Sequence, residues 1–244
     1  MCKAVVMPVN PNRGLHGHIV DDLGRRIVSG ELGANSPLDV EVLSEQYGAS
    51  RGAVREALRV LSGKGMIVAR PRRGTFATDR QAWSLLDPDL LRWDFEALPT
   101  LDMLEKLSEM RAMVEPAAAE LAARRRTADD IEILEGALSQ LAHSGDTDSS
   151  LKDKVSADIL LHTSILRATH NELIGQLVGV IEMGLRVRDE LVITDRTLDN
   201  FAGHAAVITA IREGDAEAAY ASMLTLVEHA AIDAQRLAAN GEDR

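Results

Sequence analysis

Cysteine is almost absent from this sequence, and aromatic residues are few. The 244 residues include a single cysteine, Cys2, so no disulfide can form within the chain, which is typical of a reducing compartment. Phe, Trp and Tyr make up only 3% of the chain, whereas hydrophobic residues make up 45%. The apolar residues are therefore mostly Ala, Leu, Val and Ile, which suits helices packed against helices.

Long apolar runs are also lacking. No stretch approaches the roughly 18 to 20 apolar residues that are needed to span a bilayer. The opening Met-Cys-Lys-Ala-Val-Val-Met-Pro is too short for a secretory signal. We therefore expect a soluble, cytoplasmic protein with no membrane partner, and its length allows two domains with separate cores.

Positive charge is scarce overall but concentrated in one place. The whole chain carries a net charge of −11, yet residues 51–73 carry +6, because seven basic residues accompany one acid there. A basic island on an acidic protein indicates a directed contact with nucleic acid rather than a general affinity for polyanions. The basic residues are Arg51, Arg55, Arg59, Lys64, Arg70, Arg72 and Arg73.

This island covers a predicted helix and a predicted hairpin. Ser50 is suited to cap the helix, and Val54 and Leu61 mark its apolar face. Arginines every four residues form a ridge on another face. Gly63 and Gly65 end the helix, and two short strands follow around a turn at residues 71–74. The pattern favours DNA binding, although a solvated helix beside an ordinary hairpin would carry the same charges.

The residues before this helix complete a recognisable order of elements. Residues 1–13 are expected to be flexible. Apolar residues recur every four positions from Leu15 to Ile27, and a shorter apolar pattern from Val40 to Tyr47 precedes a glycine turn. Helix, helix, turn, helix and hairpin is the order of a winged helix-turn-helix, which we expect over residues 14–78.

The run Ala-Ser-Arg-Gly-Ala-Val-Arg-Glu-Ala-Leu at residues 49–58 and the wing Arg-Arg-Gly-Thr-Phe at residues 72–76 resemble the DNA-binding domain of the GntR family of bacterial transcription regulators. In that family an arginine that contacts DNA in some members stands where this chain has Glu41, which is a departure from the pattern. The resemblance implies that DNA is contacted by Ser50, Arg51, Arg55 and Gly74, with Arg72 and Arg73 as additions at the wing.

The rest of the sequence predicts helices throughout. Residues 79–99 form a linker with a short helix, in which Trp83 and Trp93 are expected to pack rather than to line a pocket. Apolar periodicity over residues 100–240 predicts an all-helical bundle of six or seven helices. The fold class is thus mainly α, with an N-terminal winged helix-turn-helix and a C-terminal helical domain for effector binding and dimerisation.

Three polar residues of the helical domain form a second candidate site. Asp158 and His162 are four apart and lie on one face of a helix, and His204 is a polar residue on a later, apolar helix. A carboxylate and two imidazoles that converge inside a bundle would bind a first-row transition metal. An Asp and a His four apart are, however, more often a surface or hydrogen-bonded pair.

Residues 101–235 resemble the ligand domain (FCD) of the FadR-type GntR regulators, many of which hold a metal with one Asp and three His. Asp158, His162 and His204 match three of these positions, and Leu226, which cannot bind metal, occupies the fourth. His229 lies one turn further along and is expected to point elsewhere. The resemblance implies a divalent metal of the Zn, Ni or Mn class on three protein ligands.

Arg111 is the candidate for binding an effector carboxylate, because the planar guanidinium suits a bidentate contact. A salt bridge within the bundle, to Glu115, is the equal alternative. The stretch from Trp83 to Trp93 resembles the regulators of sugar-acid operons, such as galactonate repressors, and this implies a sugar-acid effector. His16, His18, His143 and His170 are expected to be surface or capping residues.

Three functional hypotheses follow. The first is a homodimeric, non-enzymatic regulator, a repressor that leaves a palindromic double-stranded DNA operator when a small carboxylate metabolite binds. The second is a metal-dependent hydrolase with an accessory winged-helix domain, because three ligands would leave room for an activated water. The third is an architectural DNA-binding protein without an effector.

Overall fold

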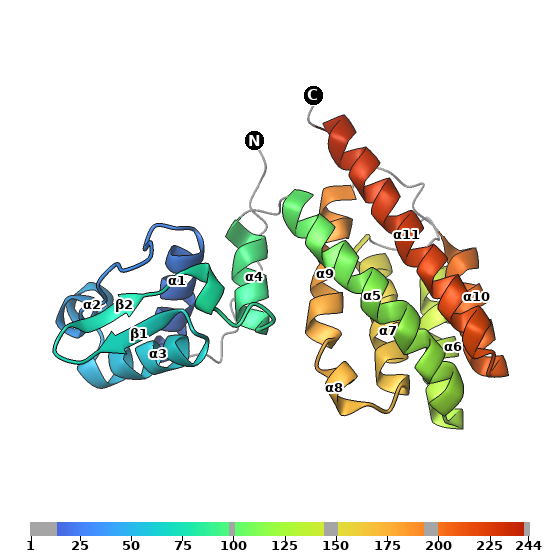
Figure 1. Cartoon of the computed structure of the whole chain (residues 1–244), viewed down its shortest axis with the longest axis horizontal. Helices are drawn as coiled ribbons and strands as arrows, with labels where there is room; N and C mark the ends of the chain where they lie inside the picture. The colour runs from blue at the N-terminus through green and yellow to red at the C-terminus, as the bar shows by residue number, and fades with distance from the viewer. Residues whose placement is uncertain (1–13, 98–100, 144–150, 193–199, 242–244) are drawn as a thin grey trace. The chain divides into compact units, whose positions relative to one another are not determined.

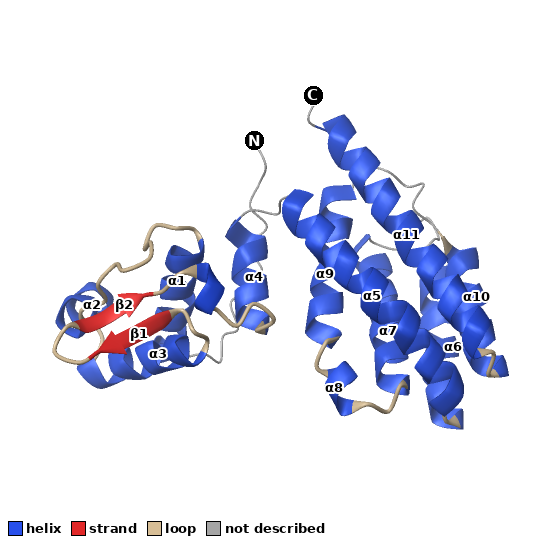
Figure 2. Ribbon diagram, viewed as in Figure 1, coloured by secondary structure: helices blue, strands red, loops and turns tan. Residues whose placement is uncertain are grey.

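The computed structural model describes residues 14–97, 101–143, 151–192 and 200–241 (Figures 1 and 2). The chain divides into two compact units, Met1–Leu98 and Pro99–Arg244. The described residues are largely helical, and one two-stranded antiparallel sheet lies in the first unit. The mainly α fold class is therefore confirmed.

The first unit has the elements of a winged helix-turn-helix. Asp39 caps α2 by accepting hydrogen bonds from the Glu41 and Val42 amides. Ser50 caps α3 by accepting from the Ala53 amide at 3.2 Å, as the sequence predicted. The elements are α1 (Leu15–Val28), α2 (Val40–Tyr47), α3 (Arg51–Gly63), β1 (Ile67–Arg70), β2 (Gly74–Ala77), the 3₁₀ turn η1 (Arg80–Ala82) and α4 (Pro88–Ala97).

The hairpin of β1 and β2 forms the wing. Its register pairs Ile67 with Ala77 and Arg70 with Gly74, so the turn between the strands carries Arg72 and Arg73. Arg72 has a φ of 59°, in the left-handed region that side chains other than glycine rarely adopt. The wing tip therefore keeps an arginine in a conformation that a glycine would adopt more easily.

Helix α4, from the predicted linker, packs into the core of the first unit. Its Leu90 and Trp93 are buried together with Ile19 and Leu23 of α1. The indole ring of Trp93 lies over Gly24, where an added Cβ would meet ring atoms at 2.5 Å. Only a glycine leaves this space, so the close approach of α1 and α4 depends on Gly24. Trp93 thus packs, as predicted.

The second unit is a helical bundle, and its helices share one hydrophobic core. Helix α5 runs without interruption through Pro116, and α11 packs along it (Figure 1). Small side chains on α5, among them Ala118 and Ala122, permit close packing. The described helices are α5 (Leu101–Arg125), α6 (Ala128–His143), α7 (Leu151–Ala168), the short α8 (Glu172–Gly175), α9 (Val178–Val192), α10 (Phe201–Glu213) and α11 (Ala216–Gly241).

Helix α10 begins at Phe201, where the Asn200 side chain accepts a hydrogen bond from the Gly203 amide and caps the helix. A capping side chain fixes a helix start more strongly than apolar periodicity does. Residues 1–13, which were predicted to be flexible, lie outside the described residues.

Candidate functional site

The exposed face of α3 carries the predicted DNA-contacting arginines. Arg51 and Arg55 are exposed, whereas Val54 and Leu61 on the other face are buried in the core. Ser50 is exposed at the start of the same helix, and Arg72, Arg73 and Gly74 are exposed at the wing. The guanidinium groups of α3 therefore face solvent and not the protein interior, as a contact with a duplex requires.

One of these arginines has a partner that the sequence analysis did not foresee. The Nε of Arg51 lies 2.5 Å from Oε2 of Glu41, the residue that replaces the family's arginine. Both side chains are exposed. The departure at residue 41 thus changes the surroundings of Arg51 directly.

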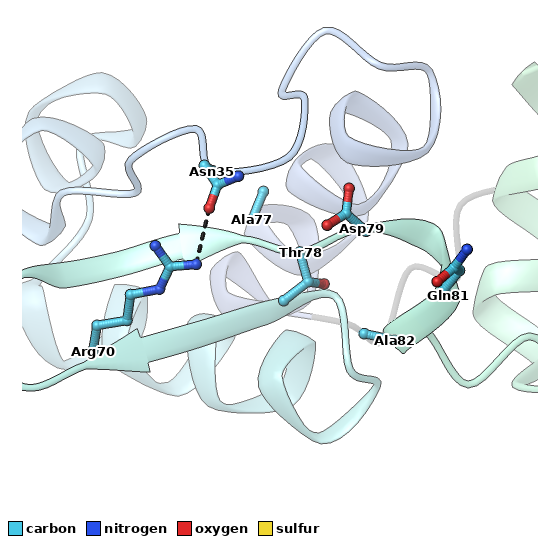
Figure 3. Close-up of a pocket in the computed structure, with 7 residues that line it drawn as sticks. All are labelled: Asn35, Arg70, Ala77, Thr78, Asp79, Gln81 and Ala82. Atoms are coloured by element: carbon cyan, nitrogen blue, oxygen red, sulfur yellow. Dashed lines mark hydrogen bonds between the residues drawn. The ribbon is translucent and has the colours of Figure 1, made fainter.

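A shallow surface hollow lies beside the wing and is lined mainly by polar residues. Figure 3 shows Arg70 reaching from β1 toward Asn35, and its Nη2 donates a hydrogen bond to Oδ1 of Asn35 at 2.9 Å. The other lining residues are Ala77, Thr78, Asp79, Gln81 and Ala82. Arg70 also lies over the Phe76 ring, 5.0 Å from its centroid, so this arginine is held against the hairpin.

The three predicted metal ligands come together in the second unit. Asp158 and His162 lie on α7 and His204 lies on α10, and all three are buried. Nε2 of His204 is 2.9 Å from Oδ1 of Asp158 and 3.3 Å from Nε2 of His162, and Nε2 of His162 is 3.6 Å from Oδ1 of Asp158. The sequence reasoning on spacing therefore identified residues that do converge.

These separations fit a metal centre. Two ligand bonds of about 2.1 Å that meet at right angles or at the tetrahedral angle place their donor atoms roughly 3.0 to 3.4 Å apart. The three measured separations bracket this range. Two imidazole nitrogens and a carboxylate oxygen are also donors that zinc and related divalent ions prefer.

Both histidines are held by their other ring nitrogen. Nδ1 of His162 is hydrogen-bonded to Oε2 of Glu115 on α5, and Nδ1 of His204 lies 2.9 Å from the Asn200 carbonyl oxygen. Acceptors at Nδ1 keep the proton there and leave the Nε2 lone pair free to bind a metal. The two Nε2 atoms are the ones that face each other and Asp158.

The charges around the cluster keep its carboxylates ionised. Burial raises the pKa of Glu115, but the charges of Arg111 and His162 and their hydrogen bonds outweigh burial and lower the pKa to about 2. Burial also raises the pKa of Asp158, but Arg188 and His162 hold it well below its usual range. Arg188 Nη2 donates to Asp158 Oδ2 at 2.8 Å.

Arg188 is the residue of this site that sequence reasoning missed. It lies on α9, close in sequence to the buried Leu185 and Val187. An arginine next to buried apolar residues was the available signal, but its partner on α7 lies 30 residues away in the chain. Only the packing of the two helices reveals the contact.

Arg111 forms the salt bridge that was the alternative interpretation. Its Nε donates to Oε1 of Glu115 at 2.6 Å, and both side chains are buried. The Cδ of Arg111 passes next to Gly184 of α9, where an added Cβ would lie 3.0 Å from it. A chain of contacts thus runs from Arg111 through Glu115 to His162.

The fourth family position contributes no ligand. Leu226 is buried in the apolar core of the bundle, while His229 is exposed. The cluster found among the described residues consists of Asp158, His162 and His204 alone. Of the remaining histidines, His170 and His143 are exposed and hydrogen-bonded to Asp130 and the Ser139 carbonyl oxygen, which agrees with surface or capping roles.

A winged helix-turn-helix with an exposed arginine face, in one chain with a separate helical bundle, is the architecture of a transcription regulator. The chain belongs to the GntR family of bacterial regulatory proteins, of the FadR type. The family model for bacterial regulatory proteins of the gntR family matches residues 15–77, and that for the FCD domain matches residues 106–229. The predicted resemblance is thereby confirmed.

Curated relatives are transcription regulators. The galactonate operon transcriptional repressor of Escherichia coli K12 is 32% identical over 86% of this chain and 92% of its own length. The regulator LutR of Bacillus subtilis is 30% identical over 83% and 94%. The protein is therefore a DNA-binding regulator and not an enzyme, which answers the hydrolase hypothesis.

Solved structures show the same fold. The structure of Lar, described as controlling the Listeria monocytogenes agr system, covers 93% of this chain and 99% of its own, with a TM-score of 0.62 and 19% identity. That identity supports the fold alone. None of the described helices is both long enough and apolar enough to cross a membrane.

Proposed function

We propose that the protein is a cytoplasmic, homodimeric repressor that leaves a palindromic operator when a small sugar-acid-like carboxylate binds its helical unit. The relative that represses the galactonate operon supports both the sign of regulation and the class of effector. Another relative, 27% identical over 64% of this chain, is the Glc operon transcriptional activator of E. coli, so the sign of regulation needs a direct test.

On the DNA side, α3 enters the major groove and the wing contacts the backbone beside it. Arg51 and Arg55 reach base edges from the start of the helix, where its cap residue Ser50 also meets the duplex. Arg72, Arg73 and Gly74 contact sugar and phosphate. Two copies related by a two-fold axis read the two half-sites of a palindrome.

On the sensor side, Asp158, His162 and His204 would hold a divalent ion of the Zn, Ni or Mn class. Such an ion supplies a Lewis-acid contact for a carboxylate oxygen. The guanidinium of Arg111 carries five N–H donors, and its Nε–H binds Glu115. The other donors can bind an effector carboxylate while the contact with Glu115 is kept. The two interpretations of Arg111 are therefore compatible.

The observation that carries this proposal is the convergence of three buried donor atoms, with both histidines held at Nδ1, in a chain of this family. In a family of regulators, a buried polar cluster of this kind serves ligand sensing better than stability, because polar burial is costly. An architectural protein without an effector would have no use for it.

The test is operator release. Protein loaded with Zn²⁺, Ni²⁺ or Mn²⁺ is bound to duplexes recovered from a random pool, and a panel of sugar acids is added. We expect at least one acid to release the wild-type protein and to leave Asp158→Asn bound. A panel that leaves the wild type bound, or that releases both proteins equally, would contradict the proposed sensor.

A further inference from the structure

The ion pair between Glu41 and Arg51 joins the two helices of the helix-turn-helix at their starts. Glu41 lies in the first turn of α2, and Arg51 is the first residue of α3. The Nε of Arg51 and Oε2 of Glu41 are 2.5 Å apart. We infer that Glu41 positions the Arg51 guanidinium for reading a guanine, an inference that rests on the proposed docking of α3.

The backbones that carry the two side chains are fixed. Asp39 binds the amide of Glu41 itself, at 2.7 Å, and Ser50 binds the Ala53 amide in the first turn of α3. Between the helices, Gly48 adopts a φ of 57°, which closes the turn. The Glu41 carboxylate is therefore presented to Arg51 from a fixed site and not from a mobile loop.

The pair contributes little to stability. The Glu41 and Arg51 side chains are 51% and 67% exposed. Ion pairs between side chains this exposed stabilise a fold by only about 0 to 1 kcal/mol, because water screens them. The consequence that remains is orientation, since a flexible arginine that is already held in place loses less freedom when it binds.

The Arg51 guanidinium has donors besides the nitrogen that lies against Glu41. The ion pair places Nε of Arg51 against Glu41, and the two terminal nitrogens of the guanidinium carry four further N–H donors. Paired N–H donors of an arginine match O6 and N7 of guanine in the major groove. The same carboxylate compensates the charge of Arg51 and repels phosphates, which lowers the affinity for DNA of any sequence. Glu41 thus favours base reading over backbone binding.

The alternative is that Glu41 itself reads DNA, by accepting a hydrogen bond from the N4 amino group of cytosine. The two roles predict that Glu41→Gln, which turns the carboxylate into an amide, loses different base preferences. A positioning residue acts through Arg51 and so affects a guanine preference. A direct reader affects a cytosine preference whether or not Arg51 is present.

The test compares Glu41→Gln with the matched control Glu56→Gln in the full-length protein. Glu56 is also 51% exposed and pairs with Arg59 at 2.7 Å on α3, so both changes remove one carboxylate from an exposed pair. Wild type, both variants, Arg51→Ala and the Glu41→Gln/Arg51→Ala double variant are each used to select duplexes from a random pool. Single-base substitutions in the selected duplex then give each base preference as a ratio of dissociation constants.

We expect Glu41→Gln to lower the guanine preference at the Arg51-dependent position by about fivefold or more, and to raise the affinity for unselected duplexes. Glu56→Gln should keep the preference, and Glu41→Gln should add no further loss of guanine preference in the Arg51→Ala background. An unchanged guanine preference in Glu41→Gln, or a lost cytosine preference instead, overturns the inference while the regulator function stands. A wild-type protein that selects no sequence overturns both.

Discussion

Nδ1 of His162 on α7 is hydrogen-bonded to the buried carboxylate of Glu115 on α5. Because the pKa of Glu115 is lowered to about 2, that carboxylate is charged at neutral pH and keeps the proton on Nδ1. The lone pair on Nε2 of His162 is then free to bind a metal, and this atom faces Asp158 and His204. Glu115 therefore supports the candidate metal centre although it is not one of its three ligands.

Replacing Glu115 with glutamine should weaken metal binding. The amide keeps the shape but not the charge, so His162 becomes a poorer ligand, and we expect the affinity for Zn²⁺ to fall by about 10- to 100-fold. Competition with a chromogenic chelator measures this. Glu120→Gln, on the same helix and paired with Arg124 at the surface, is the matched control. Equal Zn²⁺ affinities in the two variants would exclude a supporting role for Glu115.

Leu226→His should restore the fourth ligand of the family and tighten metal binding. Without metal, a buried imidazole that lacks a partner should lower the free energy of unfolding by about 1 to 3 kcal/mol. Adding Zn²⁺ should recover this stability, which thermal unfolding with and without metal measures. Leu226→Ala is the control, since it also loses apolar contacts but gains no ligand. A variant that Zn²⁺ stabilises no more than Leu226→Ala would argue against the site.

Arg72→Gly should separate stability from DNA binding. A glycine accepts the φ of 59° at this position, so the free energy of unfolding should rise by up to about 1 kcal/mol. The affinity for the operator should fall, because one wing cation is lost. Arg72→Ala should show the same loss of affinity without the gain in stability. If both variants bind the operator as the wild type does, Arg72 does not contact DNA.

We predict that the protein loses stability at alkaline pH, where Tyr47 ionises. Burial and the hydrogen bond that its hydroxyl donates to Asp22 raise the pKa of Tyr47 from 10.0 to about 12. A raised pKa means that the folded state favours the protonated form, so this stabilisation is complete below pH 10 and is lost between pH 10 and about 12.

Tyr47→Phe removes this hydrogen bond and the titration with it. At neutral pH it should lower the free energy of unfolding by about 0.5 to 1.5 kcal/mol. Between pH 10 and 12 the stability of the variant should decline less than that of the wild type. Urea unfolding at several pH values measures both effects, and parallel declines in the two proteins would show that Tyr47 does not cause the alkaline loss.

Local sequence signals predicted the first unit well. Ser50 as a cap and Gly48 as a turn are decided by neighbouring residues, and both appear as expected. The pairing of Arg51 with Glu41 was not predicted, although Glu41 departs from the family's pattern. The pair depends on how α2 and α3 are placed, and periodicity within each helix does not determine that.

The candidate metal cluster was likewise predicted in part by local spacing, and the rest of it depends on how the helices pack. The spacing of Asp158 and His162 predicted a shared helix face, but the approach of His204 follows from the packing of α10. Arg188 was not found, because its contact with Asp158 joins two helices whose apolar faces conceal it in the sequence. The sequence predicted the donors, and the tertiary structure adds the residues that orient and charge them.

The most direct test of DNA recognition by α3 is the affinity of the Arg51→Ala/Arg55→Ala double variant for a duplex selected by the wild type. Both side chains are exposed, so the melting temperature should stay close to that of the wild type. We predict that sequence-specific binding is lost while the fold remains intact. Binding of the same duplex with wild-type affinity by a folded double variant would contradict recognition through this helix.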